Sequence, residues 1–186
     1  MDKVPTIFQR DPTNMSRVTP EPHPGAAWVF AGEGHPTRKL DGTNVRVDVA
    51  GGVVVAFWKR RNPTREAKLA GAEPSYVSAS RDDPADRHLF AALDVTDTAQ
   101  WPDGQWPCEA LGPKIQGGRE SAMPRLYAFS LFPEILPEFP RTFNGIRAFL
   151  EEHPMEGVVW HHPDRQRFGK IKARDLSIPY PPKETP

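Results

Sequence analysis

Proline constrains this chain more than any other residue type, because 22 of its 186 residues are proline and they occur along nearly the whole length. Proline lacks the amide hydrogen that a helix or a central strand needs, and its ring clashes with the preceding helical turn. The 14 glycines interrupt the chain further. The sequence therefore predicts an α+β fold that is rich in antiparallel sheet and has only short helices.

The size of the chain and its 38% hydrophobic content favour one compact domain with its own core. We expect an irregular N-terminal arm over residues 1–25, which contain five prolines, and the folded domain over 26–176. The proline-rich tail over 177–186 is expected to be extended or disordered.

Charge and cysteine content restrict partners and location. The 24 basic and 24 acidic side chains cancel, so there is no global basic field and any nucleic acid must be held locally. The net charge is zero for the whole chain but negative for its middle segment, since residues 62–110 hold 4 basic and 9 acidic side chains. The single cysteine, Cys108, excludes an internal disulfide and favours a reducing compartment, so we expect a cytoplasmic location.

No apolar run approaches the roughly 20 residues that a membrane span needs, and the N-terminus lacks the apolar stretch of a signal peptide. We therefore expect a soluble, unexported protein with no membrane partner. The sequence does not fix the oligomeric state.

Short apolar runs and turn residues position the expected elements. Strands are predicted at 26–31, 44–49, 53–58, 108–112, 125–132, 156–162 and 167–173. Gly51 and Gly52 predict a tight hairpin between the second and third of these strands, and the turn-like residues 162–165 predict another between the last two. One helix is expected after Asp83, which acts as N-cap with Pro84 at the first position. A second is expected over 141–153, where apolar residues recur at helical spacing.

The first candidate motif is Lys39-Leu40-Asp41-Gly42, between two expected strands. Asp41 and Gly42 supply a turn that lifts Lys39 out of the sheet towards a cleft. Alone, the motif is also compatible with an ordinary lysine beside a turn.

Three further motifs follow. Glu109 leaves a strand into the glycine-containing loop of residues 108–118, which can approach a nucleotide closely or can be an ordinary strand exit. Glu156 lies at the mouth of an apolar strand. Lys170 and Lys172 are spaced so that both ammonium groups lie on one sheet face. A solvated edge strand would also carry such lysines.

Together and in this order, the four motifs resemble the covalent nucleotidyltransferase superfamily of polynucleotide ligases and mRNA capping enzymes. The segments KLDGTN, EALGPKIQ followed by LYAFSLF, EGVVW and KIKARDL are most similar to ATP-dependent RNA ligases. The nearest branches are the phage-type RNA ligases and the short stand-alone 5′-to-3′ RNA ligases related to them. The resemblance implies the antiparallel-sheet fold of a ligase adenylation domain with short peripheral helices. Only 14 residues follow Lys172, so we expect no appended OB domain, and a capping enzyme is a poorer match.

The resemblance also implies a reaction. Lys39 would attack the α-phosphate of ATP, release pyrophosphate and become lysyl-AMP. AMP would pass to an RNA 5′-phosphate, and that end would be sealed to a 3′-hydroxyl, so ATP and RNA ends are the expected partners. Attack needs the neutral amine, which positive charge from a metal and from Lys170 and Lys172 favours.

Further roles are implied by position. Asp41, Glu109 and Glu156 match the acids that orient Mg²⁺ (or Mn²⁺), largely through its waters. Glu109 also matches a residue near the AMP ribose, and Gly42 belongs to the nucleotide site. Phe129 matches the aromatic residue that stacks on adenine, although an aromatic residue in a strand is more often part of a core.

Arg60 is our choice from the basic residues 59–61, where the family carries a phosphate-contacting motif. A basic cluster at a strand end is otherwise usually solvated. Lys114 is a further candidate for phosphate contact. Arg38 and Ser130 stand where acids occur in the family, which leaves the details of base and ribose recognition open.

The sequence therefore predicts an ATP-dependent RNA ligase and leaves RNA repair and tRNA processing open as its purpose. The alternatives are a DNA ligase, a stand-alone adenylyltransferase, or a non-catalytic nucleotide-binding or RNA-binding protein of the same fold. Four intact motifs argue against a binding protein, which needs neither the nucleophile nor three acids. Cys108 has no evident base beside it and is interpreted as a small strand residue.

Overall fold

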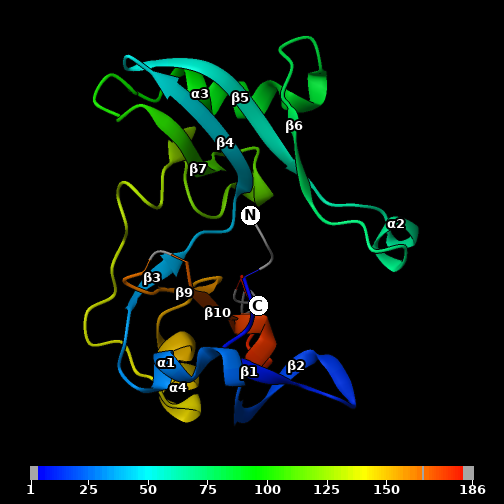
Figure 1. Cartoon of the computed structure of the whole chain (residues 1–186), viewed down its shortest axis with the longest axis vertical. Coiled ribbons are helices and arrows are strands. Elements are labelled where there is room, and N and C mark those ends of the chain that lie inside the picture. Colours follow the sequence, from blue (N-terminus) through cyan, green and yellow to red (C-terminus); the bar gives the residue numbers. More distant parts are fainter. Residues whose placement is uncertain (1–3, 165, 182–186) are drawn as a thin grey trace, which may run out of the picture. The chain divides into compact units, whose positions relative to one another are not determined.

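The computed structural model describes residues 4–164 and 166–181. Three antiparallel sheets and a few short helices make up the described chain (Figure 1), which confirms the expected α+β class. The chain divides into two compact units, each with a hydrophobic core of its own. Unit 1 takes in the chain up to Leu40 and again from Glu134, and unit 2 runs from Asp41 to Pro133. The domain boundaries drawn from the sequence, 26 and 176, stay a prediction.

Unit 1 is built on a three-stranded sheet. Its strands, in hydrogen-bonded order, are β10 (Phe168–Lys172), β9 (Gly157–His161) and β3 (His35–Lys39). β9 and β10 pair antiparallel with Trp160 opposite Gly169, so the expected C-terminal hairpin is confirmed. Within the described residues, no helix of either unit is long and apolar enough to span a membrane.

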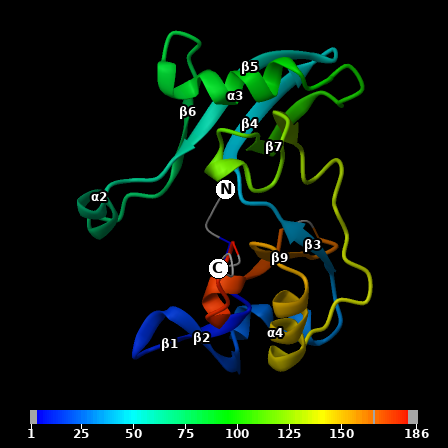
Figure 2. The same ribbon diagram turned by 180° about the vertical axis from the view of Figure 1, so that it is seen from behind.

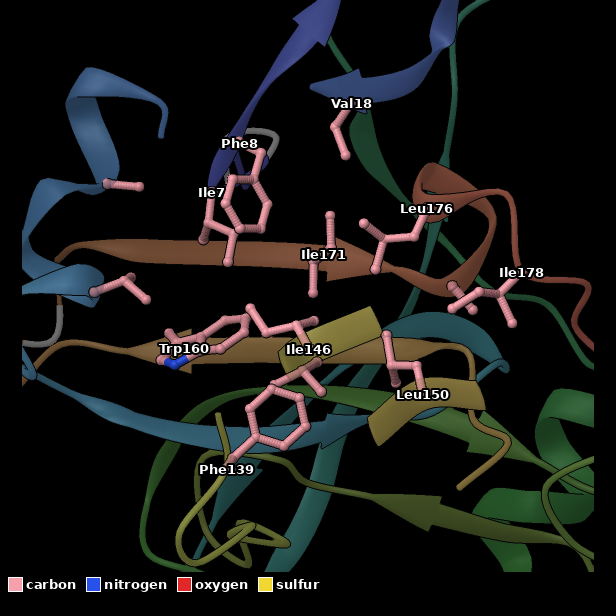
Figure 3. Close-up of a cluster of buried hydrophobic side chains, with 14 of the residues drawn as sticks. Ile7, Phe8, Val18, Phe139, Ile146, Leu150, Trp160, Ile171, Leu176 and Ile178 are labelled. Carbon is pink, nitrogen blue, oxygen red and sulfur yellow. The ribbon is translucent and has the colours of Figure 1, made fainter. Parts of the chain in front are cut away.

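The core of unit 1 covers one face of this sheet (Figure 3). Helix α4 (Phe143–Glu152) brings Ile146 and Leu150 against Trp160 of β9 and Ile171 of β10. All four side chains are at most 1% exposed. The helix expected over residues 141–153 is thereby confirmed, and its apolar stripe anchors the sheet.

The N-terminal segment is more regular than expected. Strand β1 (Phe8–Asp11) pairs antiparallel with β2 (Asn14–Pro22), so the prediction of an irregular arm over 1–25 is wrong for this hairpin. The prolines of β2 are tolerated because each strand of a two-stranded sheet has an open edge that needs no amide donor. Phe8 is buried in the core of unit 1.

The strand predicted at 26–31 is also wrong. A 3-10 turn, η1 (Pro24–Ala26), leads into the short helix α1 (Ala27–Phe30) at this point. A run of six apolar residues is too short for periodicity to separate strand from helix.

The C-terminal end of unit 1 follows β10 through a 3-10 turn, η4 (Ala173–Leu176). Ile178, in the expected tail, is buried in the core, and its N–H donates to Ala173 O at 3.0 Å. The extended or disordered tail stays a prediction, and residues 182–186 lie outside the described part of the chain.

Unit 2 is built on a five-stranded sheet. Its strands, in order, are β6 (Ser75–Ser78), β5 (Val53–Arg61), β4 (Thr43–Ala50), β7 (Gly104–Leu111) and β8 (Arg125–Tyr127). Gly51 and Gly52 form the expected turn between β4 and β5 with positive φ angles of 58° and 73°. The strand predicted over 125–132 is wrong beyond Tyr127, where the chain turns.

Helix α3 (Arg87–Asp94) covers one face of this sheet (Figure 1). Its Leu89 and Phe90 pack in a core with Val45 and Val47. It follows a 3-10 turn, η2 (Pro84–Asp86), which Asp83 caps by accepting the Ala85 N–H at 2.9 Å, as expected. A second 3-10 turn, η3 (Gln116–Gly118), follows β7. Between β5 and β6 the chain projects away from the sheet and carries the short helix α2 (Arg65–Leu69) (Figures 1 and 2).

Candidate functional site

Three of the predicted site residues meet where the strands of unit 1 end. Lys39 closes β3 and Lys172 closes β10, and the two pair with Gly157 from opposite sides. Glu156 directly precedes Gly157. Its Oε2 accepts a hydrogen bond from Lys39 Nζ and its Oε1 accepts one from Lys172 Nζ. The sheet register thus brings together three motifs that lie far apart in the sequence.

Gly157 allows the backbones of β9 and β10 to lie close together. Its φ is +157°, and a Cβ here would lie 2.1 Å from Ile171 O and 2.8 Å from Lys172 Cα. No larger residue fits without shifting the β10 backbone. The glycine of the EGVV motif is therefore required by the packing of β10 against β9.

The charge of the cluster is set by Glu156, whose side chain is 12% exposed. Burial raises the pKa of this carboxyl, but Lys39 and Lys172 lower it, and the net shift is downward. Glu156 is therefore ionised at neutral pH. One carboxylate shared by two lysines leaves positive charge in excess, which suits an anionic ligand such as a phosphate.

Asp175 fixes the backbone at Lys172. Its Oδ2 accepts the Lys172 N–H at 3.1 Å, and its Oδ1 accepts a hydrogen bond from Arg10 Nη1 at 2.8 Å. The Asp175 side chain is only 3% exposed. Sequence reasoning missed this pair, although Asp175 belongs to the quoted segment KIKARDL.

Lys170 lies two residues before Lys172 and pairs with Val159, so the two lysines share a sheet face as predicted. One rung further along the same face, His35 and His161 stack with ring centroids 5.4 Å apart and planes 7° apart. Burial, together with His35, lowers the pKa of His161 to about 4. His161 is therefore neutral at pH 7, and the sequence placed it only in the strand expected over 156–162.

A second group of predicted residues gathers in unit 2. Asp41 Oδ2 accepts a hydrogen bond from Arg119 Nη1 at 2.9 Å, and the Asp41 N–H donates to Glu120 Oε1 at 3.2 Å. A Cβ on Gly42 would lie 2.6 Å from Glu109 Cγ, so the Glu109 side chain packs against the Gly42 backbone. The turn after Lys39 and the end of β7 are thus neighbours within this unit.

The other two predicted residues of unit 2 occupy different places. Arg60 lies on β5 opposite Tyr76 of β6. Phe129 is half-buried in the turn after β8. Tyr127 is the aromatic residue that pairs with Glu109 across the sheet. Sequence reasoning missed Tyr127 because the point at which β8 ends is not visible in the apolar run.

The acids were expected to hold a metal. Among residues 4–164 and 166–181, no three His, Cys, Asp or Glu side chains form a group that could hold a metal ion. Carboxylate oxygens are nevertheless the donors that Mg²⁺ prefers, and it often keeps several waters between itself and the protein. Asp41, Glu109 and Glu156 therefore fit the ion in donor chemistry, and their joint metal site stays a prediction.

Cys108 is buried in the core of unit 2 on β7. Burial, with a contribution from Glu109, raises the pKa of its thiol to about 12. A thiol in that state is not a nucleophile at neutral pH. The interpretation of Cys108 as a strand residue agrees with this environment.

Neither a protein-family model nor a curated protein matches the sequence. Among solved structures, the fold is similar to Naegleria gruberi RNA ligase. An apo mutant of that enzyme is 15% identical with a TM-score of 0.49, covering 91% of this chain and 59% of that chain. A mutant with ATP and Mn is 16% identical with a TM-score of 0.47, covering 92% and 60%. The complex with PPi is 14% identical with a TM-score of 0.47, covering 93% and 59%.

This chain therefore spans about six tenths of the length of those ligases.

Proposed function

We propose that this chain is an ATP-dependent RNA ligase that adenylates itself on Lys39, transfers AMP to an RNA 5′-phosphate and seals that end to a 3′-hydroxyl. The observation that carries the proposal is the cluster of Lys39, Glu156 and Lys172 at the strand ends of unit 1. These residues come from three of the four motifs that resemble the ligase family.

The cluster suits attack on a phosphate. The Lys39 amine loses its proton along the hydrogen bond to Glu156, and its lone pair forms an N–P bond with the α-phosphorus of ATP. The P–O bond to pyrophosphate breaks, and pyrophosphate leaves with the bonding electrons. Lys172 supplies positive charge beside the reacting phosphate, and Lys170 adds to it from the same sheet face.

The remaining roles rest on the family resemblance. Glu109, packed against Gly42, would contact the ribose of AMP, and Phe129 would stack on adenine. Arg60 would contact phosphate during sealing. A bound Mg²⁺ or Mn²⁺ would neutralise the ATP phosphates, and Asp41, Glu109 and Glu156 would hold it largely through its waters.

The alternative functions differ in the reaction that the protein carries out on nucleic-acid ends. A DNA ligase would seal deoxyribose ends, and a stand-alone adenylyltransferase would stop after transferring AMP. A binding protein would do neither. A cytoplasmic location belongs to this proposal, since the chain's one cysteine is an unreactive free thiol. A role in RNA repair belongs to it as well.

The test supplies ATP, Mg²⁺ and 5′-labelled nicked or single strands whose terminal nucleotides on the 3′-hydroxyl side carry either ribose or deoxyribose. We expect joined product with ribose strongly preferred, because the 2′-hydroxyl is the group by which a protein distinguishes RNA from DNA. Lys39→Ala should lose joining with ATP but keep sealing of RNA that is already adenylated. Equal sealing of all-DNA ends would indicate a DNA ligase, and adenylated ends without joining would indicate an adenylyltransferase.

A further inference from the structure

The chain that joins β5 to β6, together with the ends of the two strands, projects from unit 2 and is called here the arm, residues 60–76 (Figures 1 and 2). β4 pairs with β5 only as far as Lys59. Beyond that point Arg60 pairs with Tyr76 and Arg61 with Ser75, so the base of the arm is a two-stranded neck. The arm therefore leaves the sheet while remaining tied to it by strand pairing.

The arm owes its structure to local hydrogen bonds. Thr64 caps α2 by accepting the Ala67 N–H at 3.2 Å. At the other end, the Ala72 N–H donates to Ala67 O at 2.8 Å and the Gly71 N–H donates to Lys68 O at 3.1 Å. No residue of α2 is buried. A capped helix that buries nothing contributes little to a core, so its side chains are available to a partner.

The charge of the arm differs from that of the chain around it. The arm holds four basic and two acidic side chains, whereas residues 77–110 hold two basic and seven acidic ones. Arg65 and Lys68 are three residues apart and therefore share one face of α2. Both are exposed, and within the described residues neither side chain has an ion-pair partner. Cations are thus gathered on an element that projects from an otherwise acidic segment.

The sheet face at the neck adds aromatic rings and another guanidinium. Arg46 is ion-paired with Asp48 at 2.9 Å, and its guanidinium lies 4.8 Å from the centre of the Trp58 ring and 5.4 Å from that of Tyr76. Arg60, opposite Tyr76, contributes a further positive charge near this ring. Cations and aromatic rings therefore continue from the sheet into the arm.

We propose that the arm binds the phosphate backbone of the RNA strand, with Arg65 and Lys68 as the contacting cations. This inference rests on the proposed function, which requires an RNA substrate. A chain with zero net charge has no global field to hold RNA, so the affinity must come from local cations. Cations beside aromatic side chains are the combination by which proteins hold single strands without reading sequence.

A protein or membrane partner is a poorer fit to the same surface. Leu69 is 83% exposed, but its neighbours in α2 are charged residues and alanine, so it forms no extended apolar patch. Scattered single apolar residues are normal on protein surfaces. The cations are the feature that a partner must complement.

The experiment measures binding of a 5′-phosphorylated single-stranded RNA by fluorescence anisotropy over a range of salt concentrations. The Arg65→Ala/Lys68→Ala variant should bind roughly tenfold more weakly at low salt, and its slope of log affinity against log salt should fall by about 1.4, or ~0.7 per lost contact. The matched control, Arg17→Ala/Arg87→Ala, removes two exposed cations elsewhere and should keep the wild-type slope. Lysyl-AMP formation without RNA should be the same in all three proteins.

An unchanged slope in the arm variant would overturn the proposal, as would an equal loss in the control. Loss of binding to phosphatidylserine vesicles without loss for RNA would overturn it in favour of a membrane surface. Failure of the wild type to form lysyl-AMP would reject the proposed function alone, because the binding experiment needs no ATP.

Discussion

Glu156 is the residue on which the lysine cluster depends, because its two carboxylate oxygens hold Lys39 and Lys172. Glu156→Gln keeps the shape but removes the charge, so two neighbouring ammonium groups would face a neutral amide. We expect transfer of label from ATP to the protein to fall by at least roughly 100-fold, which corresponds to ~2.7 kcal/mol. The exposed Glu151→Gln serves as the control. Labelling of Glu156→Gln within a few fold of wild type would remove this acid from the mechanism.

His161 should make the protein less stable as the pH falls. Its pKa of about 4 lies below the ordinary value of 6.5, so the folded protein binds the proton less readily than the unfolded chain. The stability that the neutral imidazole contributes is complete above about pH 6.5 and is lost as the pH falls towards 4. Urea unfolding near pH 7 and near pH 5 should show a smaller loss for His161→Gln than for wild type. The exposed His153→Gln should keep the wild-type loss, and an equal loss in all three proteins would contradict this assignment.

At the residue level, the sequence identified Lys39, Glu156 and Lys172 because each belongs to a short motif with a recognisable order. It did not identify Asp175 and Arg10 as partners, because a contact across the fold leaves no local pattern. Recognising Tyr127 beside Glu109 likewise requires the register of β7 and β8, which apolar alternation alone does not fix.

Among the elements, those with strong local signals were predicted. The hairpins β4–β5 and β9–β10 have turn residues between apolar runs, and α4 has an apolar stripe at helical spacing. β1 and β2 were missed because prolines, which normally break strands, are tolerated at the open edges of a two-stranded sheet. A run of six apolar residues is too short for its periodicity to distinguish a strand from a helix. Residues 26–31 contain the short helix α1 because Trp28 and Val29 pack into the core of unit 1 in that conformation.

The pairing of β9 with β10 gives a prediction at the element scale. A Cβ at Gly157 would meet the backbone of β10 at 2.1 Å, so Gly157→Ala must push the two strands apart. We expect the free energy of unfolding to fall by roughly 2–4 kcal/mol, above the roughly 1–2 kcal/mol that a side chain costs in a left-handed backbone conformation alone. Gly51→Ala is the matched control, since its φ is +58° and nothing lies within 4 Å. Equal losses in the two variants, measured by urea unfolding, would show that the close approach has no special cost.

On the scale of the whole molecule, the described chain forms two units, each with a core of its own, and the sequence alone does not show this division. The division falls between Leu40 and Asp41, within the first motif, so composition shifts could not reveal it. Lys39, Glu156, Lys170 and Lys172 belong to unit 1, and Asp41, Gly42, Arg60, Glu109 and Phe129 belong to unit 2. The chemistry proposed for the chain therefore draws on both units.

The central claim is that Lys39 carries AMP, and peptide mapping tests it most directly. The protein is incubated with ATP and Mg²⁺, digested, and analysed by mass spectrometry for the lysine that bears the adenylate. Lys39 should be modified, and Lys39→Arg should carry no adenylate at any position while retaining the wild-type unfolding transition. Adenylate on Lys170 or Lys172, or adenylate that persists in Lys39→Arg, would contradict the account.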